Sequence, residues 1–138
     1  MCIRDRFKAT NIRPVETYLG DINLFAVFSS ENQISSIRPN FNLLEKLPGQ
    51  GLIISSSGDK YDFVSRYFCP KFGINEDPVT GSAHTTLIPY WSYKLKKNSL
   101  PAKQISNRGG VLFCSNEENR VLIGGNAVLY MKGEIKMN

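Results

Sequence analysis

The most informative part of this 138-residue chain is the segment 72–84, which reads FGINEDPVTGSAH. It places Asp77 before a proline and sets Thr80, Gly81 and Ser82 directly before a long helix-compatible stretch. Glycine lets the backbone come close to a bound group, and the free N–H groups of a first helical turn can bind an anion. An aspartate beside that anion can give or take a proton. The combination is typical of an isomerase pocket.

These residues also have an ordinary structural interpretation. An Asp-Pro pair at Asp77 is a common turn former, and Thr80, Gly81 and Ser82 can simply cap a helix. The two interpretations of the cap do not conflict, because a bound ligand would use the same geometry. We favour a substrate-contacting role for Asp77, and we interpret its neighbour Glu76 as a solvated carboxylate.

Two further side chains are candidates for substrate binding, and both keep an alternative. His84 is the sole histidine and falls in the first helical turn, where a neutral imidazole can face a cleft or play no part in it. Arg66 lies in an aromatic strand and can bind a carboxylate through two hydrogen bonds, or form an ordinary structural ion pair. Cys69 and Cys114 are interpreted as small apolar fillers of strands.

The element that must position this segment is a helix predicted over residues 82–97. Its apolar positions recur every four residues, at Ala83, Leu87, Trp91 and Leu95. Pro89 lies inside this stretch and is expected to kink the helix or split off a first turn. A largely apolar helix that contains a tryptophan is expected at the centre of the fold.

Strands are expected on both sides of this helix. Alternating or apolar runs predict them over residues 15–19, 23–28, 51–55, 61–69, 104–108, 110–114, 120–123 and 127–132. Residues 29–47 favour short helices that Ser30 or Asn32 can cap and that an Arg-Pro pair interrupts. Strands, one buried helix and strands again predict an α+β domain in which a curved mixed sheet wraps around one central helix.

Composition narrows the function classes. A chain of this length builds one domain, and 41% hydrophobic with 21% charged residues is ordinary for a globular protein. No apolar run reaches the roughly 20 residues of a membrane span, and no signal peptide is recognisable. Three cysteines suggest neither a disulfide framework nor a metal site, so we expect a cytoplasmic protein without a metal. The net charge of +5 is spread out rather than gathered with aromatic residues, which argues against nucleic-acid binding.

The first six residues, MCIRDR, read poorly as the start of a fold. They can be back-translated into the mosaic-end sequence of a transposase that is used to prepare sequencing libraries. We therefore interpret residues 1–6 as adaptor sequence and treat residues 7–138 as the protein domain. The alternative is an unusual but genuine N-terminus. The adaptor interpretation implies that the native chain begins upstream.

The chain resembles the C-terminal half of the PhzF-like (phenazine biosynthesis) isomerases, which share the diaminopimelate-epimerase fold. The resemblance runs, in order, through YDFVSRYF at 61–68, GINEDPVTGSAH at 73–84, LIPYW at 87–91, RGG at 108–110 and GGNAV at 124–128. It covers nearly everything from about Ile12 onward, and its central block is the specific part. It implies one of two similar halves, each a sheet around a central helix, with the active site in the cleft between them.

The resemblance also implies roles for individual residues. Asp77 contacts the substrate as a proton-transfer or orienting group, and Gly81 and Ser82 hold a substrate carboxylate at the helix N-terminus. With the candidates above, the predicted substrate-binding residues are Thr80, Gly81, Ser82, His84 and Arg66. The family's main acid/base, a glutamate in a Ser-Glu-Ser/Thr motif, and a Gly-His-Pro motif belong to the other half and do not occur in this sequence.

The expected function is that of a cofactor-independent isomerase that relocates a proton on a small carboxylate metabolite. Because the family's main base lies in the other half, we expect the chain to be inactive alone. The alternative is a non-catalytic domain that binds a small anion and lacks the base. The resemblance names no substrate and leaves room for a homodimer of the intact protein. It also implies that the last strand packs on the other half, which would leave residues 127–137 with little support.

Overall fold

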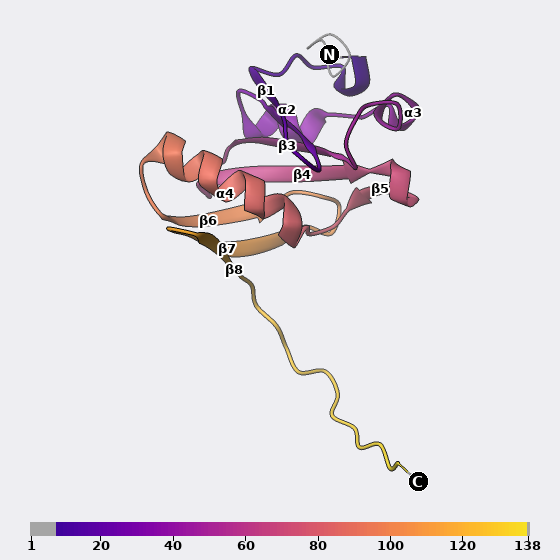
Figure 1. Ribbon diagram of the computed structural model, residues 1–138, viewed down its shortest axis with the longest axis vertical. Helices are drawn as coiled ribbons and strands as arrows, with labels where there is room; N and C mark the ends of the chain where they lie inside the picture. Colours follow the sequence, from indigo (N-terminus) through magenta and orange to yellow (C-terminus); the bar gives the residue numbers. More distant parts are fainter. Residues whose placement is uncertain (1–7, 138) are drawn as a thin grey trace.

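A curved mixed sheet and one long helix form the framework, and the computed structural model describes residues 8–137 of the chain (Figure 1). The strands are β1 (Glu16–Leu19), β2 (Leu24–Val27), β3 (Leu52–Ser57), β4 (Phe63–Cys69), β5 (Ile74–Asp77), β6 (Ser99–Gln104), β7 (Gly110–Glu117) and β8 (Arg120–Gly124). The helices are α2 (Glu31–Ser36), α3 (Phe41–Leu44) and α4 (Gly81–Leu95), with a short 3-10 helix at Pro70–Phe72. No helix among these described residues is long and apolar enough to cross a membrane.

The strand order in the sheet is β1-β2-β3-β4-β6-β7-β8. β2 and β3 are parallel, as are β4 and β6, whereas the other neighbouring pairs are antiparallel. β5 lies off this path and pairs with the end of β4, at Tyr67 and Cys69. β6 pairs with the start of β4. β4 is buried along its whole length because both of its faces are covered.

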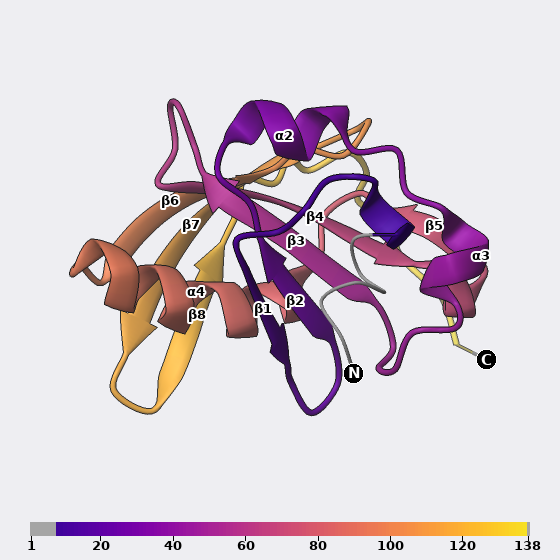
Figure 2. The ribbon, with the colours of Figure 1, turned by 90° about the horizontal axis from the view of Figure 1, so that it is seen from above.

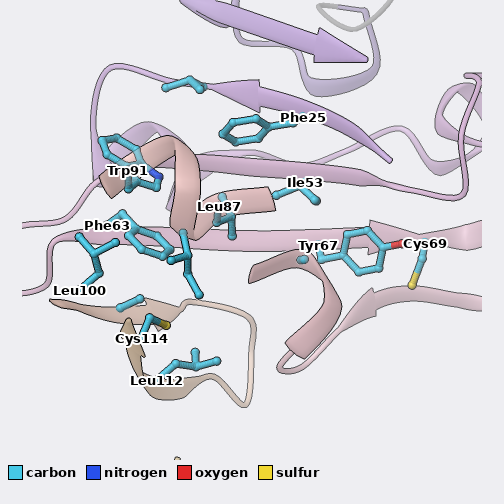
Figure 3. Close-up of a cluster of buried hydrophobic side chains, with 14 residues drawn as sticks. Phe25, Ile53, Phe63, Tyr67, Cys69, Leu87, Trp91, Leu100, Leu112 and Cys114 are labelled. Carbon is cyan, nitrogen blue, oxygen red and sulfur yellow. The ribbon is translucent and has the colours of Figure 1, made fainter. Parts of the chain in front are cut away.

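Different helices cover the two faces of the sheet (Figure 2). α4 packs into a cluster with side chains from β2, β3, β4, β6 and β7; Figure 3 shows its Leu87 and Trp91 among these side chains, and Trp91 is stacked on Phe63. α2 and α3 cover the opposite face, where Ile34 and Leu44 belong to a second cluster. Because one helix contacts strands from one side of the sheet to the other, the sheet curves around α4. This confirms the predicted α+β fold with a sheet wrapped around a central helix.

α4 is one continuous helix, so Pro89 does not split off its first turn. Pro89 lies on the exposed side, where the carbonyl freed in the preceding turn can bind water. Of the predicted apolar positions, Ala83, Leu87 and Trp91 are buried, and Leu95 is 38% exposed. Full burial of a leucine-sized side chain contributes roughly 1.5–3 kcal/mol, so these positions hold the helix on the sheet.

The strand predicted over residues 104–108 is wrong, because the strand runs from Ser99 to Gln104 instead. The prediction treats Pro101 as a boundary, but Pro101 lies inside β6. Its carbonyl accepts a hydrogen bond from Asp62 N–H (2.9 Å), and β4 pairs with β6 only from Ala102 onward. The missing N–H of Pro101 therefore interrupts no pair with β4.

Two other strand predictions also differ from the structure. The short strand β5 (Ile74–Asp77) was not predicted, because its four residues sit inside the segment interpreted as a turn. The strand predicted over residues 127–132 is wrong: residues 125–137 have no regular structure and run away from the sheet after β8 (Figure 1). Tyr130, for example, is 97% exposed. The little support that the resemblance implies for residues 127–137 is confirmed.

Candidate functional site at the N-terminus of α4

The ends of β5 and β6 meet at the same place beside β4. Asp77, the last residue of β5, lies opposite Tyr67, and Gln104, the last residue of β6, lies opposite Ser65. The two strands run toward each other, since β5 is antiparallel to β4 and β6 is parallel to it. The chain then passes from β5 into α4, which begins at Gly81. The helix N-terminus is thereby fixed at this junction.

The side chain of Gln104 fastens the connection between β5 and α4. Its Oε1 accepts a hydrogen bond from the backbone N–H of Thr80 (2.8 Å), and its Nε2 donates to the backbone oxygen of Asp77 (2.7 Å). The same Nε2 lies 3.1 Å from Thr80 Oγ1. Gln104 is fully buried, so breaking these bonds would leave polar atoms without partners at a cost of about 1–3 kcal/mol.

Ser106 and Gly110 support the same connection from the β6–β7 side. Ser106 Oγ donates to the backbone oxygen of Pro78 (2.6 Å) and accepts from the N–H of Gly109 (2.9 Å). Gly110 packs against Val79 so closely that an added Cβ would lie 2.6 Å from Val79 Cγ2. The loop that carries the candidate residues is therefore held by contacts distant in sequence.

The N-terminus of α4 has no side-chain cap. Thr80 occupies the N-cap position with an extended backbone, but its hydroxyl donates to Asp77 Oδ2 and makes no bond to the first turn. The first N–H groups of a helix have no partner within the helix. Gly81 and Ser82 are exposed residues, so the start of the helix, with the positive end of its dipole, is accessible from solvent. This end of the helix can bind an anion.

The packing of the protein does not require a glycine at position 81. A Cβ added to Gly81 would meet no other atom within 4 Å, and its backbone is not in the left-handed region. A larger residue would therefore fit the fold. The missing side chain leaves the helix N-terminus open to a group that approaches from outside.

Two surface hollows border the first turn of α4. The first, which we call the uncharged hollow, has a volume of about 510 Å³ and is lined by Val79, Gly81, Gly110, Val111, Leu112, Ile123, Gly124, Gly125 and Asn126. The second, the Asp21 hollow, has a volume of about 320 Å³ and includes Asp21, Asn23, Tyr67, Ser82 and Thr85 in its lining. The lining of the first hollow contains no charged residue, whereas Asp21 lines the second.

His84 lies inside the fold and does not face either hollow. Its ring is fully buried, its centroid lies 5.9 Å from that of Phe63, and its Nδ1 lies 2.7 Å from the backbone oxygen of Thr80. A carbonyl oxygen only accepts, so Nδ1 carries the proton of the neutral ring. Burial lowers the pKa of His84, which keeps the ring neutral. In this position His84 supports Thr80 and does not reach a ligand at the helix N-terminus.

Arg66 lies on the opposite face of β4 from the α4 N-terminus. Its Nε and Nη2 donate to the two carboxylate oxygens of Glu76 (2.7 and 2.8 Å), and its Nη1 donates to the backbone oxygens of Ile34 and Ile37 (3.0 and 2.9 Å). The structure places Arg66 in a structural ion pair, and Glu76 is its partner instead of a solvated neighbour. Since successive strand residues face opposite sides, this pair also turns Asp77 toward α4.

The cysteines of the described chain, Cys69 and Cys114, are buried. Burial raises the pKa of Cys69 and raises that of Cys114 to about 11, so both thiols stay protonated at neutral pH. Neither supplies the thiolate that nucleophilic chemistry needs. Both residues act as the small strand fillers that the sequence predicts.

Sequence reasoning placed residues 77–82 together but missed Gln104 and Ser106. A signal for Gln104 exists, because it continues the inward-facing alternation of Leu100 and Ala102. A polar residue at the next inward position needs a buried partner. The signal was lost because the strand was predicted to start at residue 104 instead of ending there.

Comparison with known proteins gives a family match over nearly the whole chain. The family model described as phenazine biosynthesis-like protein (PhzC-PhzF) matches residues 5–133. An uncharacterized isomerase of Pseudomonas aeruginosa is 45% identical over 131 residues, which are 95% of this chain and 50% of the relative. An uncharacterized isomerase of Halalkalibacterium halodurans is 41% identical over 126 residues, covering 90% of this chain and 48% of the relative.

A solved structure supports the same family match. The crystal structure of a PhzF-family phenazine biosynthesis protein from Enterococcus faecalis superposes with a TM-score of 0.90 at 47% identity, covering 99% of this chain and 53% of that chain. This chain therefore spans about half the length of the relatives that it matches. On the family match, the identities and the shared fold, the chain belongs to the PhzC-PhzF family of phenazine biosynthesis-like proteins.

Proposed function

We propose that the protein is an isomerase that relocates a proton on a small carboxylate substrate without a cofactor. The observation that carries the proposal is the uncapped N-terminus of α4, with Asp77 held beside it by Thr80. Two relatives that the chain resembles are named isomerases. Since the chain spans about half of their length, the proposal concerns the whole protein that contains it.

In the proposed mechanism, the amides of Gly81 and Ser82 bind the substrate carboxylate. When a proton leaves a carbon next to, or conjugated with, that carboxylate, these donors stabilise the negative charge that develops. Asp77 orients the substrate or returns the proton at another carbon. The rest of the substrate lies in the uncharged hollow, whose lining is mostly apolar, because in the other hollow Asp21 would repel the nearby substrate carboxylate.

The experiment uses the longest product that the gene encodes, dialysed against a chelator and incubated in D₂O with a panel of small β,γ-unsaturated carboxylic acids. Proton relocation predicts deuterium in the substrate or a moved double bond, both visible by NMR. Asp77→Asn should slow this exchange by at least about a hundredfold, the usual contribution of an acid/base group. Exchange at the parent rate in Asp77→Asn would remove Asp77 from the mechanism.

A second candidate function is anion binding without turnover. It is favoured by one observation: Oδ2 of Asp77 already accepts a hydrogen bond from the Thr80 hydroxyl. Within residues 8–137, Asp77 is the carboxylate that is bonded to the N-cap residue of α4. Binding without turnover predicts that acetate shifts the amide resonances of Gly81 and Ser82 while no acid on the panel takes up deuterium. Deuterium uptake that depends on Asp77 would exclude this candidate.

A further inference from the structure

We infer that Gln104 is a positioning residue for Asp77. It fixes the direction of the Thr80 hydroxyl proton, and that proton in turn holds the carboxylate. The inference rests on the proposed function only in the role that it gives to Asp77, which is to orient the substrate or return a proton. The arrangement of the three side chains stands on its own hydrogen bonds.

The orientation of the Gln104 amide is settled by two backbone partners. The N–H of Thr80 can only donate, so the atom 2.8 Å from it must be the side-chain oxygen. The backbone oxygen of Asp77 can only accept, so the atom 2.7 Å from it must be the NH₂ group. A flipped amide would lose both bonds at a fully buried position. Gln104 therefore always presents a donor to the Thr80 hydroxyl.

This donor decides where the single proton of the Thr80 hydroxyl points. Thr80 Oγ1 accepts from Gln104 Nε2 at 3.1 Å, so the hydroxyl proton is free to bond with Asp77 Oδ2. A hydrogen bond to an ionised carboxylate is stronger than one between neutral groups. Thr80 is only 6% exposed, so bulk water has little access to compete for this bond.

The hydrogen bond from Gln104 Nε2 to Thr80 Oγ1 also leaves the N-terminus of α4 without a side-chain cap. In α2 the N-cap residue Ser30 accepts a hydrogen bond from the Gln33 N–H (3.3 Å) with its hydroxyl oxygen. The oxygen of Thr80 is instead engaged by Gln104 and makes no bond to the first turn of α4. One buried glutamine thus has two effects: it orders the carboxylate and leaves the helix amides available for a ligand.

The test measures the side-chain order of Asp77 by NMR in the longest product of the gene. Three-bond couplings about χ1 should report one rotamer in the parent protein and an average in Gln104→Met. The matched control is Gln33→Met, a glutamine of α2 that bonds Ser29 N–H, and it should keep the parent couplings. A single parent-like rotamer of Asp77 in folded Gln104→Met would overturn the inference.

Two variants of Thr80 and one of Gln104 keep the test decisive if Gln104→Met fails to fold. Gln104→Glu keeps an acceptor for the Thr80 N–H but loses both donated bonds, and Thr80→Val loses the hydroxyl, so both should average the Asp77 couplings. Thr80→Ser keeps the hydroxyl and should restore one rotamer. Parent-like couplings in Thr80→Val would overturn the inference.

Acetate titration of the parent protein separates this inference from the proposed function. Amide shifts at Gly81 and Ser82 that saturate with acetate support the anion site, and their absence counts against the proposed function alone. The Asp77 couplings do not depend on acetate, so they decide the role of Gln104 in either case.

Discussion

The starts of α2 and α3 differ from the start of α4 in what their cap residues do. Ser30 accepts from the Gln33 N–H (3.3 Å), and the Asn40 side chain accepts from the Leu43 N–H (3.2 Å), so both short helices are closed by their own side chains. Thr80 stands at the corresponding position of α4, but its hydroxyl bonds Asp77. Among residues 8–137, the longest helix is left without a side-chain cap.

The difference separates residues that stabilise the fold from residues that are available to a ligand. On the face covered by α2 and α3, the charged and polar groups satisfy one another, as Arg66 does with Glu76 and the end of α2. At the start of α4 the polar groups order one carboxylate and leave backbone donors exposed. Substitutions on the first face should therefore change stability, and substitutions at the second place should change binding.

The largest loss of stability is expected when Arg66 is replaced on the face of the sheet that α2 and α3 cover. Arg66→Met leaves the half-buried Glu76 without its partner and frees the carbonyls of Ile34 and Ile37, so we expect a loss of about 2–4 kcal/mol in the free energy of unfolding. Urea unfolding followed by circular dichroism measures it. The folded fraction should still bind acetate. A loss below about 1 kcal/mol would mean that the ion pair contributes no more to stability than an exposed surface pair.

His84 should make stability fall in mild acid. Burial lowers the pKa of His84 below its ordinary 6.5, so below pH 6.5 the unfolded chain binds a proton that the folded protein does not. Stability contributed by the neutral ring is complete above pH 6.5 and is lost as the pH falls toward the folded pKa. The slope is at most about 1.4 kcal/mol per pH unit for one proton. The free energy of unfolding, measured in urea, should depend less steeply on pH in His84→Gln than in the parent protein. Equal slopes in the two proteins would contradict the burial of the ring.

Removing the side-chain cap of α2 should lower the free energy of unfolding by a smaller amount. Ser30→Ala takes away the acceptor for the Gln33 N–H, and loss of such a cap typically costs about 1 kcal/mol. Thermal or urea unfolding compares the variant with the parent. Acetate binding should be unchanged, because α2 covers the other face of the sheet. If acetate affinity fell with stability, the two regions would not be independent.

The smallest change in stability is expected at Gly81, together with a clear change in binding. A methyl group at this position meets no protein atom within 4 Å, so Gly81→Ala should stabilise the protein by about 0.4–1 kcal/mol or leave it unchanged. The same methyl group would obstruct an anion that approaches the amide. We expect acetate affinity, measured from amide shifts, to fall by about tenfold or more, equivalent to at least about 1.4 kcal/mol. Unchanged affinity would place the anion elsewhere.

Sequence patterns located the residues of the site that are neighbours along the chain. The segment 77–82, the helix after it and the buried positions Leu87 and Trp91 follow from local turn chemistry and helical periodicity. Local reasoning could not reveal that the ends of β5 and β6 meet beside β4. That meeting depends on strand pairing between distant segments, so Gln104 and its bonds to Thr80 stayed outside the prediction.

Where both faces of a strand are buried, the sequence pattern also could not predict which face a given residue points to. In β4 every position is buried, so the apolar alternation that would assign Arg66 to one face is weak. Only the covering helices decide it: α2 offers its last carbonyls to Arg66, whereas α4 packs over Tyr67 on the other side. The same ambiguity hid the partnership of Arg66 with Glu76.

The packing of Trp91 gives this protein a built-in optical reporter. Trp91 is the single tryptophan of the chain, its ring is stacked on Phe63 (centroids 5.8 Å apart, 5° between planes), and its indole N–H donates to Ser55 Oγ (2.9 Å). Emission from the indole therefore comes from one place, the contact between α4 and the sheet. When α4 leaves the sheet, the ring enters water and its fluorescence shifts to longer wavelength. Undocking of the helix that carries the site can thus be followed directly, without a label.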